Sequence, residues 1–158
     1  MELEIGQAAP DFELRDQHGQ AVSLSSFRGS KAVVLVFYPF AFSGVCTGEL
    51  REIRDNLPRF ESDEVRLLAV SCDPMFSLRA VADKDGLTFP LLSDFWPHGE
   101  VSADYGVLDS ERGCSSRSTF IIDKDGVLRW SVHNALPDAR DLSEYERILA
   151  ELDARSGA

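Results

Sequence analysis

Apolar residues follow two kinds of pattern along the chain, continuous runs and helical repeats. The runs Ala32–Phe37 and Val65–Ser71 are rich in β-branched residues and predict strands that are buried on both faces. Elsewhere apolar residues recur every three or four positions with charged residues between them, which predicts amphipathic helices. The two clearest repeats are Leu50, Ile53, Leu57 and Phe60, and Leu142, Tyr145, Ile148, Leu149 and Leu152.

Turn residues predict two hairpins. The polar turn Asp16–Gly19 separates two short alternating segments near the start of the chain. A second hairpin is predicted around the Asp125-Gly126 pair, where it joins residues 119–122 to residues 127–130.

Proline and glycine mark the ends of the predicted helices. The helix that begins near Cys46 should end or kink around Pro58, because proline lacks the N–H that a helix interior needs. A second helix is predicted from Pro74 to Asp85, where Gly86 ends it. A short helix is predicted over residues 99–105.

The order of these elements is strand–helix–strand–helix, followed by a hairpin and a helix, which is typical of the thioredoxin-like fold. We therefore expect an α/β protein with an N-terminal β-hairpin extension and a central mixed β-sheet flanked by helices. The length of 158 residues, without an internal repeat or a linker-like stretch, predicts a single domain over residues 1–158.

The chain is acidic, since 27 Asp and Glu against 16 Lys and Arg give a formal net charge of -11. This charge would repel nucleic acids and anionic membranes at long range, so we expect neither as a partner. The N-terminus has no basic segment followed by an apolar one. The longest apolar run, Ala32–Phe42, is interrupted by Pro39 and too short to cross a bilayer. We therefore expect a cytoplasmic protein.

Motifs for cofactors and metals are not found in the sequence. No glycine motif typical of nucleotide binding occurs, and the three histidines are isolated from one another. The three cysteines do not have the spacing of a metal site. We expect no cofactor and no metal. In a reducing compartment, an odd number of cysteines favours a reactive thiol over a structural disulfide.

Cys46 is the strongest candidate for a reactive thiol. It follows the strand Ala32–Phe37 at the point where the next helix should begin. The unpaired N–H groups and the positive dipole end of a helix both stabilise a thiolate, which is the nucleophilic form. A single cysteine is more often a small buried apolar residue, so the neighbouring residues have to decide between the two interpretations.

The residues around Cys46 resemble the active-site signature of the peroxiredoxins, Pro-x-x-x-Thr/Ser-x-x-Cys. In this chain the signature is Pro39-Phe-Ala-Phe-Ser43-Gly-Val-Cys46. Four other segments are similar to the family in the same order: Ala9–Phe12, Val70–Asp73, Phe89–Asp94 and Arg117–Asp123. The run Ser93–Gly99 is especially similar to the AhpE-like one-cysteine peroxiredoxins of actinobacteria, and the resemblance extends over roughly residues 6–150.

This resemblance implies a role for each residue of the site. Cys46 would attack the terminal oxygen of a hydroperoxide and become a sulfenic acid. Arg117 would stabilise the thiolate and the negative charge of the transition state. Ser43 would hydrogen-bond the sulfur and the peroxide oxygens, although it lacks the methyl that restricts the more usual Thr. Pro39 would shield the thiolate from water, and Glu49 is either a partner of the arginine or a solvated helix carboxylate.

These roles describe a thiol-dependent peroxidase for hydrogen peroxide and organic hydroperoxides, whose sulfenic acid must react with a second thiol. The family position five residues after Cys46 that can carry this thiol is Arg51 here, and no C-terminal resolving segment is visible. The internal candidates are Cys72, at a strand end, and Cys114, in a polar loop near Arg117, with Cys114 the better of the two. We expect instead that an external thiol or a redoxin reduces the enzyme. The resemblance also implies a homodimer.

Two other functions would use similar chemistry. A thiol–disulfide oxidoreductase on this fold would need Cys-x-x-Cys, but Ser43 and Glu49 occupy the two positions that could complete this motif with Cys46. A redox sensor, in which oxidation of Cys46 signals to a partner, needs only the activated thiol and stays open. Repeated turnover with an added reductant distinguishes an enzyme from a sensor.

Overall fold

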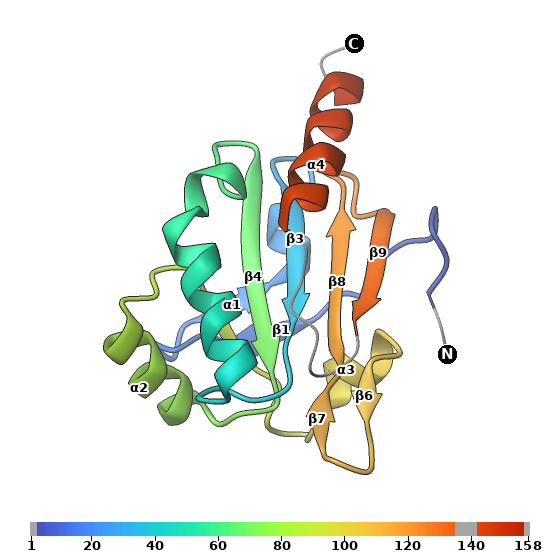
Figure 1. Cartoon of the computed structure of the whole chain (residues 1–158). Helices are drawn as coiled ribbons and strands as arrows, with labels where there is room; N and C mark the ends of the chain where they lie inside the picture. Colours follow the sequence, from blue (N-terminus) through green and yellow to red (C-terminus); the bar gives the residue numbers. More distant parts are fainter. Residues whose placement is uncertain (1–2, 135–141, 157–158) are drawn as a thin grey trace.

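The computed structural model describes residues 3–134 and 142–156, and this part of the chain contains a seven-stranded sheet (Figure 1). In spatial order its strands are β2 (Ala21–Ser23), β1 (Glu13–Arg15), β5 (Leu91–Ser93), β4 (Val65–Ser71), β3 (Ala32–Phe37), β8 (Arg117–Ile122) and β9 (Leu128–Asn134). Strands β3, β4 and β5 are parallel, and the other pairings are antiparallel. The central sheet is therefore mixed, as predicted.

Helices cover both faces of this sheet (Figure 1). They are α1 (Gly44–Asp55), α2 (Met75–Asp85), α3 (Glu100–Asp104) and α4 (Leu142–Ser156). Helices α1, α2 and α4 contribute to the core on one face, and α3 contributes to the core on the other. None of the helices in the described ranges has the length and apolar content needed to cross a membrane.

Side chains alternate along the buried strands and so supply two apolar cores, one on each face of the sheet. In β3, Val34 and Val36 belong to the core shared with α1, α2 and α4, whereas Val33, Leu35 and Phe37 belong to the other. All six residues of β3 are buried. This burial on both faces explains why the strand is an uninterrupted apolar run in the sequence.

Most predicted boundaries are confirmed. Helix α1 ends at Asp55, before Pro58, and α2 ends where Gly86 adopts a left-handed conformation with φ 65°. The two predicted hairpins are β1–β2 and β8–β9. Strands β8 and β9 extend further than predicted, and Leu24 begins a short 3-10 helix instead of continuing β2.

Three short strands are not predicted by the sequence pattern: β5, β6 (Leu108–Asp109) and β7 (Cys114–Ser115). The prediction that Cys114 lies in a polar loop is wrong. The side chain of Asp109 accepts hydrogen bonds from the N–H groups of Glu111 and Arg112, both at 3.1 Å, and Gly113 has φ 67°. The turn therefore closes before Cys114, which pairs in β7 and is fully buried.

Gly48 and Gly86 form a matched pair for measuring the backbone contribution to stability. A Cβ added at either position would meet no atom within 4 Å. Gly86 has φ 65°, whereas Gly48 lies inside α1 without a positive φ. Gly48→Ala should raise the free energy of unfolding by about 0.5–1 kcal/mol. Gly86→Ala should lower it by about 1 kcal/mol. Urea unfolding measures both changes, and shifts of the same sign would contradict this assignment.

Candidate active site

Distant segments of the chain meet at the carboxyl edge of the parallel strands. Strand β3 ends at Phe37, and the loop of residues 38–43 leads into α1, whose third residue is Cys46. Strand β8 runs antiparallel to β3, and Ser118 pairs with Phe37. The first residue of β8, Arg117, therefore lies at the same edge as Cys46, although the two residues are separated by 71 positions.

The side chains of Cys46, Arg117 and Glu49 form one buried cluster. Nη2 of Arg117 donates a hydrogen bond to Sγ of Cys46 at 3.5 Å. Nη1 of the same guanidinium donates to Oε1 of Glu49 and forms an ion pair. The exposed fractions are 0% for Cys46, 2% for Arg117 and 4% for Glu49, so Glu49 is not a solvated carboxylate and Arg117 is not a surface arginine.

The charges in this cluster favour negative charge on the sulfur. The carboxylate of Glu49 compensates the guanidinium charge on one side, which offsets the cost of burying that charge. The other side of the guanidinium contacts Cys46 and stabilises negative charge there. Cys46 lies in the first turn of α1, as predicted, where the backbone N–H groups and the helix dipole act in the same direction.

Ser43 and Pro39 belong to the segment that leads into α1. Ser43 is the half-buried N-cap residue of the helix, and Pro39 is buried. The Ser43 side chain makes no capping hydrogen bond, so its hydroxyl is not committed to the helix and can bond to a substrate. Its backbone carbonyl accepts the N–H of Thr47 at 2.8 Å, which fixes the start of α1.

The other two thiols have different surroundings. Sγ of Cys72 lies 3.7 Å from Oγ of Ser115 and 4.0 Å from Oγ of Ser102. Burial raises the pKa of the Cys72 thiol, and burial raises the pKa of Cys114 to about 11. Both are therefore neutral thiols near pH 7 and poor nucleophiles. All three cysteines are free, and only Cys46 is hydrogen-bonded to a buried arginine among the residues described.

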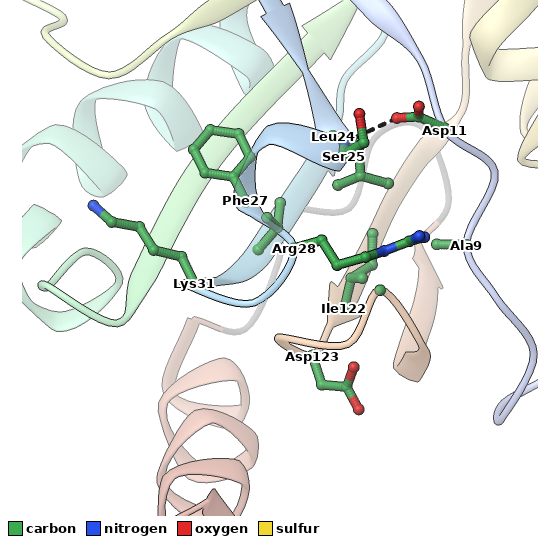
Figure 2. Close-up of a pocket in the computed structure, with 11 residues that line it drawn as sticks. Ala9, Asp11, Leu24, Ser25, Phe27, Arg28, Lys31, Ile122 and Asp123 are labelled. Carbon is green, nitrogen blue, oxygen red and sulfur yellow. Dashed lines mark hydrogen bonds between the residues drawn. The ribbon is translucent and has the colours of Figure 1, made fainter.

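The hollow shown in Figure 2 lies near the amino end of β3, at the opposite edge of the sheet from Cys46. Arg28, Asp11 and Asp123 are among the residues that line it. Its volume of about 10 Å³ is room for a single water molecule. This hollow is therefore too small to bind a hydroperoxide. Within residues 3–134 and 142–156, no cluster of three or more His, Cys, Asp or Glu side chains could hold a metal ion.

Comparisons with known proteins match most of the chain. The model of the AhpC/TSA family matches residues 5–131. Alkyl hydroperoxide reductase E of Mycobacterium tuberculosis is 47% identical over 152 residues, which cover 96% of this chain and 99% of the relative. A chloroplastic 2-Cys peroxiredoxin of Arabidopsis thaliana is 37% identical over 158 residues and is matched over 94% of this chain and 59% of its own length.

Solved structures agree with these matches. The reduced 2-Cys peroxiredoxin of Plasmodium vivax has a TM-score of 0.88 at 28% identity and covers 98% of this chain and 84% of its own. The AhpC of Mycobacterium tuberculosis has a TM-score of 0.82 at 26% identity, and the match covers 97% of this chain and 99% of the AhpC chain. The fold is thus the thioredoxin-like fold of the peroxiredoxins, as the sequence resemblance implied. The chain belongs to the AhpC/TSA family.

Sequence reasoning assigns no role to Asp73, which contacts the loop before Cys46. Its carboxylate accepts a hydrogen bond from the backbone N–H of Ala41 at 2.8 Å. The signal that could have found it is its position just after the carboxyl end of β4, the parallel neighbour of the strand that leads to Cys46. Ligand sites of parallel sheets form at this edge.

Breaking the buried ion pair between Arg117 and Glu49 should cost more stability than breaking an exposed ion pair, because it leaves a buried charge without a counter-charge. Glu49→Gln preserves the side-chain shape but removes the counter-charge of a buried guanidinium, and should lower the free energy of unfolding by about 3 kcal/mol. Glu146→Gln is the matched control, because the pair Arg59–Glu146 has side chains 62% and 38% exposed. An exposed pair of this kind contributes about 0–1 kcal/mol to the free energy of unfolding. Urea unfolding measures both variants, and similar losses would contradict the comparison.

Proposed function

We propose that this chain is a thiol-dependent peroxidase with Cys46 as its nucleophile, and that residues 1–158 act as one catalytic domain. The observation that carries the proposal is the hydrogen bond from Arg117 to the buried Cys46 sulfur, 3.5 Å long, at a helix N-terminus. The names of the relatives, an alkyl hydroperoxide reductase and a peroxiredoxin, support the same activity.

In the proposed reaction the Cys46 thiolate attacks the terminal oxygen of a hydroperoxide in line with the O–O bond. The S–O bond forms as the O–O bond breaks, so the sulfur is oxidised to a sulfenic acid and the peroxide is reduced. The leaving oxygen departs as alkoxide or hydroxide and is protonated by water, which gives an alcohol or water. Hydrogen peroxide and organic hydroperoxides are both proposed substrates.

The proposed roles of the other residues follow from their chemistry. Arg117 stabilises the thiolate and the negative charge shared by sulfur and oxygen in the transition state. Glu49 orients the guanidinium through the ion pair. Ser43 hydrogen-bonds the peroxide oxygens, because a hydroxyl both donates and accepts. Pro39 is buried in the loop before α1 and helps to exclude water from the sulfur.

We propose that an external thiol or a redoxin regenerates the enzyme. Its thiolate attacks the sulfenic sulfur, and the S–O bond breaks as the S–S bond of a mixed disulfide forms. The departing hydroxide takes up a proton from solvent to give water, and a second thiol then reduces the mixed disulfide. Cys72 and Cys114 are disfavoured as internal partners because burial raises the pKa of both thiols. Arg51, five residues after Cys46, instead forms an ion pair with Asp85 at 2.8 Å.

We also propose a cytoplasmic homodimer. Large apolar side chains are exposed in the segments that follow the carboxyl ends of β3, β4 and β5. These side chains are Phe40, Phe42, Phe76, Phe95 and Trp96. They share the edge of the sheet that carries the active site, and a second copy of the chain would remove them from water.

Stopped-flow oxidation of the fully reduced protein, followed by tryptophan fluorescence, tests the peroxidase activity. Hydrogen peroxide and an organic hydroperoxide should both react much faster with the protein than with free cysteine. The reaction should vanish in Cys46→Ser and slow by about 10²- to 10³-fold in Arg117→Ala, which loses the transition-state cation. Arg129→Ala is the control, because Arg129 is a half-exposed arginine of the neighbouring strand β9. A rate equal to that of a free thiol, unchanged in Arg117→Ala, would contradict the function.

Serine variants of Cys72 and Cys114 test the one-cysteine cycle. Cys72→Ser, Cys114→Ser and the double variant should keep the wild-type turnover with dithiothreitol, because neither thiol takes part. Mass spectrometry after one equivalent of peroxide and trapping with dimedone should find the sulfenic acid on Cys46. A stoichiometric disulfide between Cys46 and either other cysteine would contradict the cycle. A redox sensor would stop after one turnover.

A further inference from the structure

The loop that carries Pro39 and Ser43 has little support of its own. The backbone hydrogen bond within it, from the N–H of Ser43 to the carbonyl of Phe40, is long at 3.4 Å. Phe42 has φ 72°, a left-handed conformation that is unfavourable for a residue with a Cβ. A strained backbone persists only where surrounding groups hold it. The N–H of its first residue, Tyr38, bonds to the carbonyl of Val70 in β4 at 3.0 Å, and beyond this residue the loop requires a further anchor outside itself.

Asp73 provides this anchor. Its Oδ2 accepts hydrogen bonds from the N–H of Ala41 and the hydroxyl of Ser71, both at 2.8 Å. Its backbone carbonyl accepts the hydroxyl of Ser93 at 2.6 Å. Ser71 is the last residue of β4 and Ser93 the last of β5, so Asp73 is fixed to the ends of two parallel strands. As a charged acceptor, its carboxylate binds the loop more strongly than a neutral oxygen would.

This anchor aligns parts of the site that belong to different elements of the fold. Cys46 belongs to α1, Arg117 to β8, and Pro39 and Ser43 to the loop. Strands β4 and β8 both pair with β3, on opposite sides of it. Holding the loop against the end of β4 therefore sets its position relative to the guanidinium on β8.

We propose that Asp73 is a positioning residue, which holds the loop of residues 38–43 over Cys46 so that Ser43 and Arg117 act on the same peroxide. This proposal rests on the peroxidase function proposed above. The anchor has two effects: it aligns the substrate, and it covers a sulfur that has no exposed surface. Loss of the anchor should therefore slow oxidation by peroxide and expose the sulfur to other reagents.

The test compares Asp73→Ala and Asp73→Asn with the matched control Asp16→Ala. Asparagine keeps an oxygen that can accept the N–H of Ala41, and alanine does not. Asp16 is a suitable control because one of its carboxylate oxygens accepts two backbone N–H groups, of His18 at 2.8 Å and Gln20 at 3.0 Å. It lies in the turn between β1 and β2, and strands β5 and β4 separate these strands from β3.

Two reaction rates and the thermal midpoint of unfolding are measured on the reduced full-length protein. The rates are oxidation by hydrogen peroxide and alkylation of Cys46 by iodoacetamide, which is followed by peptide mass spectrometry. Asp73→Ala should oxidise about 10- to 100-fold more slowly, because small misplacements of reacting groups have large effects on rate. Its alkylation should become faster, and Asp73→Asn should recover most of the oxidation rate. Asp16→Ala should lower the thermal midpoint and leave both rates unchanged.

The two rates distinguish positioning from general damage. Slowing of both reactions in Asp73→Ala, an unchanged oxidation rate, or the same changes in Asp16→Ala would overturn the proposal. Ser71→Ala is a milder variant that keeps the carboxylate but loses one bond to it, and it should shift both rates in the same directions by less. A wild-type protein no faster than free cysteine would refute the peroxidase function instead. Alkylation would then still decide whether Asp73 holds the loop over the sulfur.

Discussion

The guanidinium of Arg117 is a full positive charge that is almost entirely removed from water, and much of the site follows from the need to compensate it. The compensating carboxylate comes from Glu49, which lies on the same face of α1 as Cys46. The ion pair therefore determines how α1 is rotated about its axis, and this rotation directs the sulfur toward the same guanidinium. Such a buried pair contributes to a unique geometry more than to stability.

The sheet supplies the other half of this geometry. Phe37 pairs with Ser118, so the side chain of Arg117 points to the same face as Ile121, which is the face that α1 covers. A slip of one residue between β3 and β8 would turn Arg117 to the opposite face, away from Cys46. The apolar cores on the two faces prevent this slip, because they fix which residues of each strand point inward. The apolar packing of the sheet and the chemistry of the site are therefore specified together.

The strands that are buried on both faces could be predicted closely, and Ala32–Phe37 matches β3 at both ends because an uninterrupted apolar run has clear limits. The environment of Arg117 could not be predicted from the pattern, since an arginine in a strand is usually exposed; only the family resemblance indicated its position. The spacing of Glu49 from Cys46 predicted a shared face, but not what that face packs against. Asp73 binds a backbone amide, so its position after a strand end was the one signal of its role, and Cys114 lies in a strand too short to show alternation.

Glycine is used differently in α1 than elsewhere in the described chain. Every other described glycine has a positive φ, whereas Gly44 and Gly48 do not, and a Cβ at either would meet no atom within 4 Å. Neither strain nor crowding requires them, yet they lie on both sides of Cys46 and weaken the helix relative to alanine. The helical form of the turn that carries Cys46 therefore depends on tertiary contacts, the ion pair of Glu49 among them, more than on helix propensity.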